Sequence, residues 1–309
     1  MKLRQAVEHY IRLKQSLGLR FATDSQILKA FSQAMGQVRV GQVQPNAVRA
    51  YLDGSGPVTR NWERKWVALR GFYVFALARG LVRRSPLPAW APKVERPFTP
   101  HIYSLEELRH LLQAIPPEKA GRGWSAPTLR TLLLLLYGAG LRLSEALQLK
   151  ASDVDLEEGL LCVRKSKFFK SRLVPLGPKL AQVLKDYAGK RSEMADPNRP
   201  FFCTKQGAPV TCGAVEWAFR KLCVAADVKR TDGTGYQPRL HDLRHSMATH
   251  CLVSWYHQGR DTQSLLIQLS AYLGHVDIAG TQKYLTMTPE LRGQASARFA
   301  RYALGGSHE

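Results

Sequence analysis

The chain has 309 residues, 45% of them apolar, which is enough for two domains with ordinary packed cores. Lysine and arginine number 45 against 24 aspartate and glutamate residues, so the formal net charge is +21. An excess of this size favours a polyanionic partner, with nucleic acid as the commonest, over a basic surface that serves solubility alone.

The five cysteines are scattered and odd in number, and none stands at CxxC spacing, which argues against a disulfide frame or a zinc knuckle. The N-terminal stretch lacks the apolar segment of a signal peptide, and the longest apolar run, 132–141, is too short to cross a bilayer. We therefore expect a soluble intracellular protein without a membrane partner, located in a bacterial cytoplasm or nucleoid.

The first 90 residues predict four helices. Apolar spacing indicates the first over about 2–18, and the second begins at Thr23 or Asp24. Pro45 suits the first turn of the third helix, and Thr59 can cap the fourth. The expected core residues of these helices are Leu3, Val7, Ile11 and Leu17, then Ile27, Phe31 and Met35, then Val48 and Leu52, and finally Trp62, Trp66, Leu69, Tyr73 and Leu77.

Basic residues follow the aromatic stripe of the fourth helix. Arg60, Arg64 and Lys65 fall outside that stripe, so they form a separate face. Such a face is often merely solvated, but in a chain this basic we also consider it a DNA-binding surface.

Five prolines stand within residues 85–100, where they remove backbone donors and prevent a helix from continuing. We therefore expect a helical domain over 1–90, a proline-rich linker over 91–100 and a second domain over 101–309.

The second domain begins with Ser104 followed by Glu107, the pattern of a capping box. The apolar segment 126–137 predicts a central buried helix. Two β-rich runs between 154 and 175, separated by KFFK, predict a small antiparallel sheet. Further helices are expected at about 178–191, 213–226, 241–257, 262–272, 278–286 and 289–303.

Several polar residues of this domain are candidates for a site. Arg142 directly follows the buried helix and its glycine turn, where a cation is costly unless it meets an anion or an internal acid such as Glu145. Arg244 lies one turn from His241 on the same helix face, so the two can converge on one ligand. Singly, Lys167, His275 and Tyr284 would be an ordinary surface lysine, a helix-end histidine and a core tyrosine.

Together these residues form an ordered pattern. GAGLRLSEAL contains Arg142, SKFFKSRLVPL contains Lys167, HDLRHSMATH contains His241 and Arg244, and LGHVDIAGTQKYL contains His275 and Tyr284. This order resembles the tyrosine recombinases, or phage integrase family, over about residues 100–290. Two features depart from the family pattern: the hairpin lacks the usual glycines, which leaves Lys165 and Lys170 as alternatives to Lys167, and extra residues around 254–262 lengthen the interval from His241 to His275.

The resemblance implies a mainly α fold with a small antiparallel β-sheet, in which a four-helix core-binding domain precedes the catalytic domain. It implies a site-specific DNA recombinase that cuts and rejoins strands through a covalent 3′-phosphotyrosyl intermediate, without a metal or other cofactor. The implied roles are nucleophile for Tyr284, a phosphate clamp for Arg142 and Arg244, protonation of the leaving oxygen by Lys167, acid–base work by His241, a phosphate hydrogen bond from His275, and support of the arginines by Glu145.

The implied partners are a double-stranded DNA recombination site and further copies of the chain, as dimers and a tetramer on DNA. Residues 289–303 carry an apolar stripe that either packs on its own domain or docks on a neighbouring protomer. The layout is similar to Xer-type enzymes, and the long interval between His241 and His275 favours a recombinase of a mobile element.

Three other readings stay open. His241 and His245 stand four residues apart, as in a helical zinc motif, with His250 and Cys251 nearby, but Asp242 replaces the usual glutamate. A DNA-binding accessory protein without catalysis would share the basic surface. A type IB topoisomerase would share the chemistry and would relax supercoiled DNA that lacks any specific site.

Overall fold

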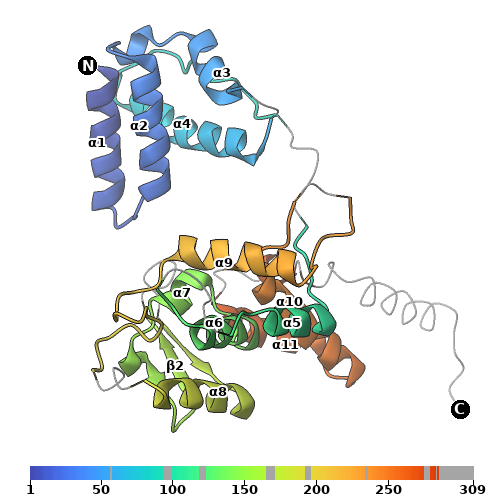
Figure 1. Cartoon of the computed structure of the whole chain (residues 1–309). Helices are drawn as coiled ribbons and strands as arrows, with labels where there is room; N and C mark the ends of the chain where they lie inside the picture. Colours follow the sequence, from blue (N-terminus) through green and yellow to red (C-terminus); the bar gives the residue numbers. More distant parts are fainter. Residues whose placement is uncertain are drawn as a thin grey trace, which may run out of the picture. The chain divides into compact units, whose positions relative to one another are not determined.

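The structure is a computed structural model that describes residues 1–55, 58–92, 99–117, 123–164, 171–191, 196–233, 236–274, 279–282 and 284. The chain divides into two compact units, Met1–Phe98 and Thr99–Glu309. The division falls inside the proline-rich range 91–100, which the sequence predicts as a linker. Figure 1 labels the main helices of each unit.

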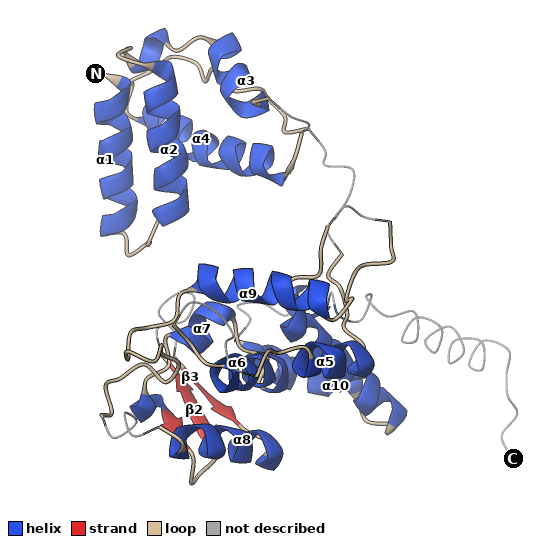
Figure 2. Cartoon of the chain, viewed as in Figure 1, coloured by secondary structure: helices blue, strands red, loops and turns tan. Residues whose placement is uncertain are grey.

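Helices make up the N-terminal unit (Figures 1 and 2). They are α1 Leu3–Ser16, α2 Ala22–Met35, α3 Pro45–Asp53 and α4 Arg60–Ala78, with a 3₁₀ turn, η1, at Val40–Gln42. Local sequence signals determine where two of these helices begin. Pro45 opens α3, and the Thr59 hydroxyl accepts a hydrogen bond from the Asn61 amide at 3.3 Å before α4.

Aromatic and aliphatic side chains form the core of this unit. Phe31, Phe72 and Tyr73 are almost fully buried. Gly71 lets α1 approach α4 closely, because a Cβ at this position would lie 2.6 Å from the Tyr10 hydroxyl. Trp62 donates from Nε1 to Asp53 Oδ1 at 2.7 Å and so ties α4 to α3.

Three expected core residues lie outside this core. Ile27 is only partly buried, and the neighbouring Leu28 takes the fully buried position. Leu17 is 66% exposed because α1 ends at Ser16, and the chain turns away there. Leu77 is 39% exposed. A step of four residues turns the helix about 40° beyond a full turn, so Ala76 takes the buried position in place of Leu77.

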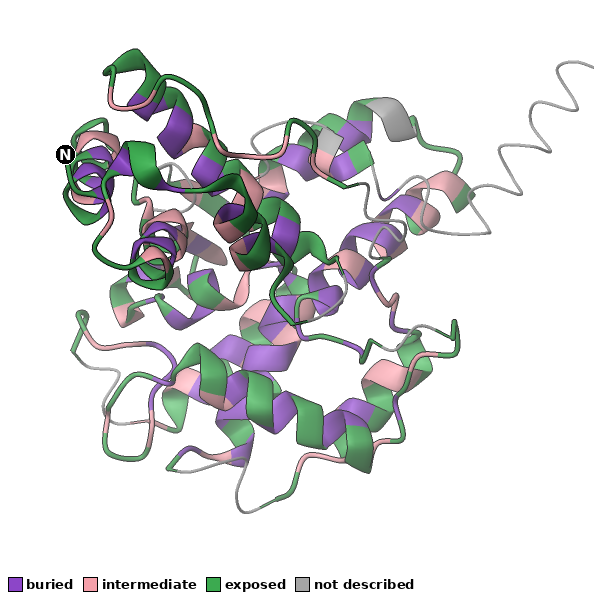
Figure 3. Cartoon of the chain, turned by 90° about the horizontal axis from the view of Figure 1, so that it is seen from above, coloured by how far each residue is buried: buried purple, intermediate pink, exposed green. Residues whose placement is uncertain are grey.

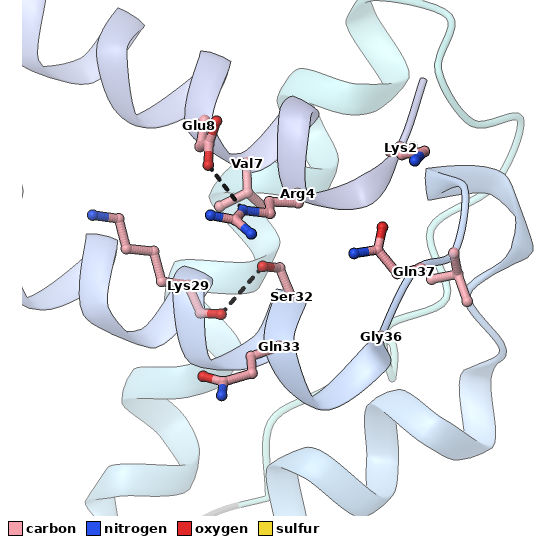
Figure 4. Close-up of a pocket in the computed structure, with 10 residues that line it drawn as sticks. Lys2, Arg4, Val7, Glu8, Lys29, Ser32, Gln33, Gly36 and Gln37 are labelled. Carbon is pink, nitrogen blue, oxygen red and sulfur yellow. Dashed lines mark hydrogen bonds and ion pairs between the residues drawn. The ribbon is translucent and has the colours of Figure 1, made fainter.

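A hollow of about 470 Å³ opens between the start of α1 and the end of α2 (Figure 4). Lys2, Arg4 and Lys29 contribute positive charge to its wall. Arg4 Nε donates to Glu8 Oε1 at 3.2 Å, so part of this charge is neutralised within α1.

The C-terminal unit combines helices with a small sheet, as Figure 2 shows. A three-stranded antiparallel sheet has the order β1-β2-β3. The mainly α fold with a small antiparallel sheet is therefore confirmed. Its elements are α5 Leu105–Gln113, α6 Ala126–Gly138, α7 Leu143–Leu147, a 3₁₀ turn η2 at Ala151–Asp153, β1 Val154–Asp155, β2 Leu160–Val163, β3 Arg172–Pro175, α8 Pro178–Gly189, α9 Cys212–Ala225, α10 Asp242–His257, α11 Thr262–Leu273 and α12 Ala279–Gln282.

The predicted capping box is present at the start of α5. The Ser104 hydroxyl accepts from the Glu107 amide at 3.0 Å, and Glu107 Oε2 accepts from the Ser104 amide at 2.7 Å. The prediction that α6 is central is also confirmed, because Leu133 and Leu135, which point about 160° apart around this helix, are both buried. Most other helices carry buried and exposed residues on different faces (Figure 3).

Strand pairing sets the base of the predicted basic turn. Val163 of β2 pairs with Arg172 of β3, and the chain between them holds Lys165, Lys167 and Lys170. These three lysines, His275 and the expected helix 289–303 lie outside the described residues. Among the helices that are described, none combines the length and apolar character needed to cross a membrane.

Candidate active site

The C-terminal unit brings Arg142, Glu145, Arg244 and Tyr284 together. Arg142 is the N-cap of α7, Glu145 lies within α7, and Arg244 lies in the first turn of α10. Arg142 Nη1 donates to Glu145 Oε1 at 2.7 Å, and Arg244 Nη1 lies 4.0 Å from Glu145 Oε2. Residues separated by more than a hundred positions in the sequence therefore share one carboxylate.

A glycine turn makes this approach possible. Gly140 has φ +58°, a conformation that favours glycine, and a Cβ there would overlap Met247 Cε and lie 2.8 Å from Leu273 Cδ2. The Gly140 carbonyl accepts a hydrogen bond from Arg244 Nη1 at 2.6 Å. The turn after α6 therefore packs directly against α10 and α11, and it delivers Arg142 to the same place.

Arg142 is the more open of the two predicted clamp arginines. Its side chain is 26% exposed, whereas that of Arg244 is 2% exposed. Besides the bond to Glu145, Arg142 Nη2 donates to the Gly274 carbonyl at 3.4 Å. The Arg142 guanidinium is therefore held on its inner side while part of it faces solvent, as a group that binds an anion must be.

Arg244 is bound to backbone on two sides. Its Nη1 donates to the Gly140 carbonyl, and its Nη2 donates to the Leu273 carbonyl, each at 2.6 Å. Burial, followed by the charge of Arg142, lowers the pKa of Arg244 to about 10, and Tyr284 and Glu145 oppose this change. Arg244 therefore remains a cation at neutral pH.

Glu145 is ionised despite its burial. Burial by itself would raise its pKa, but the hydrogen bonds and charge of Arg172, together with those of Arg142, lower it to about 2. The Arg142 amide also donates to Glu145 Oε2 at 3.0 Å. A carboxylate that is 7% exposed is thus matched by neighbouring cations, as a buried charge requires.

His241 stands at the N-cap of α10, exposed to solvent on one side. Desolvation by the surrounding protein, then the charges of Arg244 and Arg239, lower its pKa to about 4. The imidazole is therefore neutral at neutral pH. His245 lies beside it, with ring centroids 4.9 Å apart, and the His245 ring centroid is 5.5 Å from that of Tyr284.

Tyr284 is 1% exposed. It packs in an apolar cluster with Met247, Ala248 and Leu252 of α10 and Leu266, Leu269 and Leu273 of α11. Burial raises the pKa of the Tyr284 phenol, and the charge and hydrogen bond of Arg244 oppose the rise. The phenol is neutral at neutral pH, and a guanidinium that can stabilise a phenolate lies beside it.

Arg172 is a residue of this cluster that the sequence analysis missed. Its side chain is 13% exposed, and its Nη1 and Nη2 donate to Glu145 Oε1 and Oε2 at 3.1 and 2.9 Å. A signal was present: Arg172 begins a strand and pairs with the buried Val163. A cation at such a position needs an internal anion.

The structure describes only some of the remaining predicted residues. Lys167, its alternatives Lys165 and Lys170, and His275 lie outside the described residues. In the N-terminal unit, Arg60 and Arg64 are exposed. Lys65 donates from Nζ to the Tyr51 carbonyl at 2.8 Å and lies 4.6 Å from the Tyr51 ring centroid.

The described residues of the site include several hydrogen-bond donors that suit a phosphate. Within the described ranges, no group of three or more histidine, cysteine, aspartate or glutamate side chains could hold a metal ion. Two guanidiniums, a neutral imidazole and a phenol suit phosphoryl transfer, because fork-shaped cations stabilise the charge that develops on phosphate oxygens.

Known proteins are similar to this chain in both sequence and fold. The profile of the phage integrase family matches residues 104–290. The protein y4rB of Sinorhizobium fredii, named as an integrase/recombinase, is 35% identical over 96% of this chain and 97% of its own length. The tyrosine recombinase XerA of Thermococcus kodakarensis is 31% identical over 83% of this chain and 82% of its own.

Among solved structures, a lambda integrase tetramer bound to a Holliday junction superposes with a TM-score of 0.68 at 17% identity. The match covers 92% of this chain and 77% of the integrase chain. The family profile and the relatives that match most of the chain show that the chain belongs to the phage integrase family of tyrosine recombinases and is a site-specific DNA recombinase.

Proposed function

We propose that Tyr284 is the nucleophile that attacks a phosphodiester of the recombination site. The Tyr284 oxygen forms a bond to phosphorus, the bond from phosphorus to the 5′-oxygen breaks, and the strand ends as a 3′-phosphotyrosyl ester and a 5′-hydroxyl. The proton of the phenol leaves, and the departing oxygen gains one. Because the ester retains the bond energy, attack by a 5′-hydroxyl rejoins a strand without ATP.

One observation carries this proposal: the buried phenol of Tyr284 lies beside Arg244, whose charge favours the phenolate. Arg142 shares the Glu145 carboxylate with Arg244 and keeps an exposed side. Two guanidinium groups, which are always ionised and here lie close together, can bind the two nonbridging oxygens of a phosphate. We assign that clamp to Arg142 and Arg244, and its support to Glu145.

Further roles rest on the family pattern together with the chemistry of each side chain. His241, neutral and exposed, serves as acid and base at the phosphate. Lys167 protonates the departing 5′-oxygen, with Lys165 and Lys170 as alternatives, and His275 donates a hydrogen bond to the phosphate. The chemistry requires no metal ion, because guanidiniums and the lysine supply the positive charge.

Recombination requires DNA and more than one copy of the chain. The net charge of +21 suits a DNA partner, and we propose Arg60, Arg64 and Lys65 as part of the contact in the N-terminal unit. The related fold of a lambda integrase tetramer on a Holliday junction supports assembly of dimers and a tetramer on DNA. We assign residues 289–303 to contacts between protomers.

The element served by this recombinase is a finer proposal. The long interval between His241 and His275 motivates a recombinase that integrates, excises or transposes a mobile element. The match to y4rB, named as an integrase/recombinase, at 35% identity over 96% of this chain, agrees with an enzyme that integrates DNA. Sequencing the DNA that the Tyr284→Phe protein retains would identify the site. A site at the boundary of an element would support this assignment, and a chromosome-dimer resolution site would contradict it.

The nucleophile is tested with a suicide DNA substrate that carries the identified site and a nick near the scissile phosphate. The wild-type chain should form an adduct that resists SDS, and Tyr284→Phe should form none. Tyr272→Phe is a control, because the Tyr272 hydroxyl donates to the Pro175 carbonyl rather than to the arginine cluster. An adduct with Tyr284→Phe would refute the assignment, and relaxation of plasmids without the site would favour a topoisomerase.

A further inference from the structure

The C-terminal end of α11 is held by three arginines from three different parts of the unit. Arg172 Nε donates to the Tyr272 carbonyl at 3.0 Å, Arg244 Nη2 to the Leu273 carbonyl at 2.6 Å, and Arg142 Nη2 to the Gly274 carbonyl at 3.4 Å. The last carbonyls of a helix lack intrahelical donors and carry partial negative charge, so cations are stabilising there. Each of three successive carbonyls thus receives its own guanidinium.

The same three arginines converge on Glu145. The Arg172 side chain makes two hydrogen bonds to this carboxylate, the Arg142 side chain makes one at 2.7 Å, and Arg244 Nη1 lies 4.0 Å away. Paired N–H···O bonds between a guanidinium and a carboxylate fix orientation as well as distance. The position of the Glu145 carboxylate, and with it that of Arg142, therefore depends on Arg172.

Arg172 differs from Arg142 in how its nitrogens are used. Nε, Nη1 and Nη2 each donate to an oxygen of the protein. Its side chain is 13% exposed, whereas Arg142 is 26% exposed and makes a longer bond from Nη2. Arg172 is thus committed to internal partners, while Arg142 retains a side for substrate.

Gly274 allows Arg172 to lie directly against the chain that leaves α11. Gly274 has φ +66°, and a Cβ there would lie 2.8 Å from Arg172 Nη1 and 3.0 Å from Arg172 Cζ. Any other residue would press on the guanidinium as well as adopt a strained backbone conformation. Arg172 and Gly274 therefore form one packed unit.

Arg172 also stands at the base of the hairpin turn. It pairs with Val163 across β2 and β3, and the turn between these residues carries Lys165, Lys167 and Lys170. One side chain thus connects the strand that leaves the basic turn, the carboxylate of α7 and the end of α11.

We propose that Arg172 is a positioning residue for strand cleavage. It orients the Glu145 carboxylate and the Tyr272 carbonyl, and through them it sets Arg142 and the chain that follows α11. This inference rests on the proposed cleavage by Tyr284. Arg172 itself does not contact DNA in this account, so its loss should slow the chemical step while leaving DNA affinity nearly unchanged.

The test compares Arg172→Lys, Arg172→Gln, Glu145→Gln and the double variant Arg172→Gln/Glu145→Gln with the wild-type chain. For each protein, single-turnover formation of the SDS-resistant adduct is measured at saturating suicide substrate, together with DNA affinity and the thermal unfolding temperature. Arg191→Lys is the control. Arg191 belongs to the same unit but donates to Tyr187 and Cys203, away from the cluster.

Misplacing a catalytic group by about 1 Å can cost about a hundredfold in rate, so both Arg172 variants should cleave about 10- to 100-fold more slowly. Their DNA affinity should stay within about threefold of wild type, since phosphate contacts dominate affinity. The double variant should be no slower than the slower single variant, because residues that act through one contact are not additive. Arg191→Lys should cleave at the wild-type rate.

Arg172→Lys that cleaves as fast as the wild-type chain would overturn the inference. So would fully multiplicative losses in the double variant, or a loss of affinity and unfolding temperature that matches the loss of rate. A wild-type chain that forms no adduct at all would instead overturn the proposed function, and the inference with it.

Discussion

The two units of this chain differ in whether charged side chains are buried in them. Among the described residues of the N-terminal unit, only Ser32 has a side chain that is both polar and buried. The rest of the core is aromatic and aliphatic. The C-terminal unit buries Glu145, Asp153, Asp242 and Arg244. Burying charge is costly unless partners surround it. The costly buried charges therefore lie in the unit that contains the proposed active site.

The largest effect on stability should come from the apolar core of the N-terminal unit. Phe72 is fully buried, and Phe72→Ala should lower the free energy of unfolding of this unit by about 3–5 kcal/mol. Urea-induced unfolding measures this change. The exposed Val74→Ala on the same helix is the matched control and should change little. Equal losses for both variants would contradict the assignment of this core.

After loss of the proposed nucleophile Tyr284, the largest effect on chemistry should come from Arg244. Arg244→Lys keeps a cation but loses the fork that bonds to the Gly140 and Leu273 carbonyls. Removing one donor from a developing oxyanion typically costs about 10²–10³ in rate, and we expect a loss of that size in single-turnover adduct formation. A loss below about tenfold would show that Arg244 is structural and not part of the phosphate clamp.

The lowered pKa of Glu145 predicts how the stability of the C-terminal unit depends on pH. The folded-state pKa of Glu145, about 2, lies below the ordinary value of about 4.3. The ionised carboxylate therefore makes its full contribution to the stability of the fold when the pH is above about 4.3. This contribution is lost as pH falls from about 4 to about 2. The stability difference between wild type and Glu145→Gln should therefore be largest near neutral pH and shrink across this window. A difference that is constant from neutral pH into this acid window would contradict the ionised, arginine-bound state of Glu145.

The smallest expected effect concerns the surface of the N-terminal unit. Each phosphate contact contributes about 0.9 to the slope of log affinity against log salt concentration. Arg60→Gln/Arg64→Gln should therefore lower the magnitude of that slope by about 2. Arg4→Gln is the control, since Arg4 is paired with Glu8. An unchanged slope in the double variant would exclude these arginines from the DNA contact.

Local signals made much of the fold predictable from the sequence. Pro45, the Thr59 cap and the Ser104–Glu107 capping box each act within one helical turn, so their outcome depends on few neighbours. The hairpin and the buried α6 follow from periodicity. Leu17 was misplaced because spacing alone does not show where a helix ends.

The site was predictable only in part. The order of Arg142, His241, Arg244 and Tyr284 could be recognised, and the pairing of Arg142 with Glu145 follows from their spacing on α7. Arg172 was missed because its partners lie 27 and 100 positions away. The burial of Tyr284 likewise depends on packing of α10 against α11, which no local pattern encodes.

The most direct test of the central claim is to identify the residue that becomes linked to DNA. The adduct formed on a suicide substrate would be digested with nuclease and trypsin, and the modified peptide sequenced by mass spectrometry. We predict a nucleotide attached through phosphate to Tyr284, in a peptide that ends at Arg292. A nucleotide on any other residue would contradict the account.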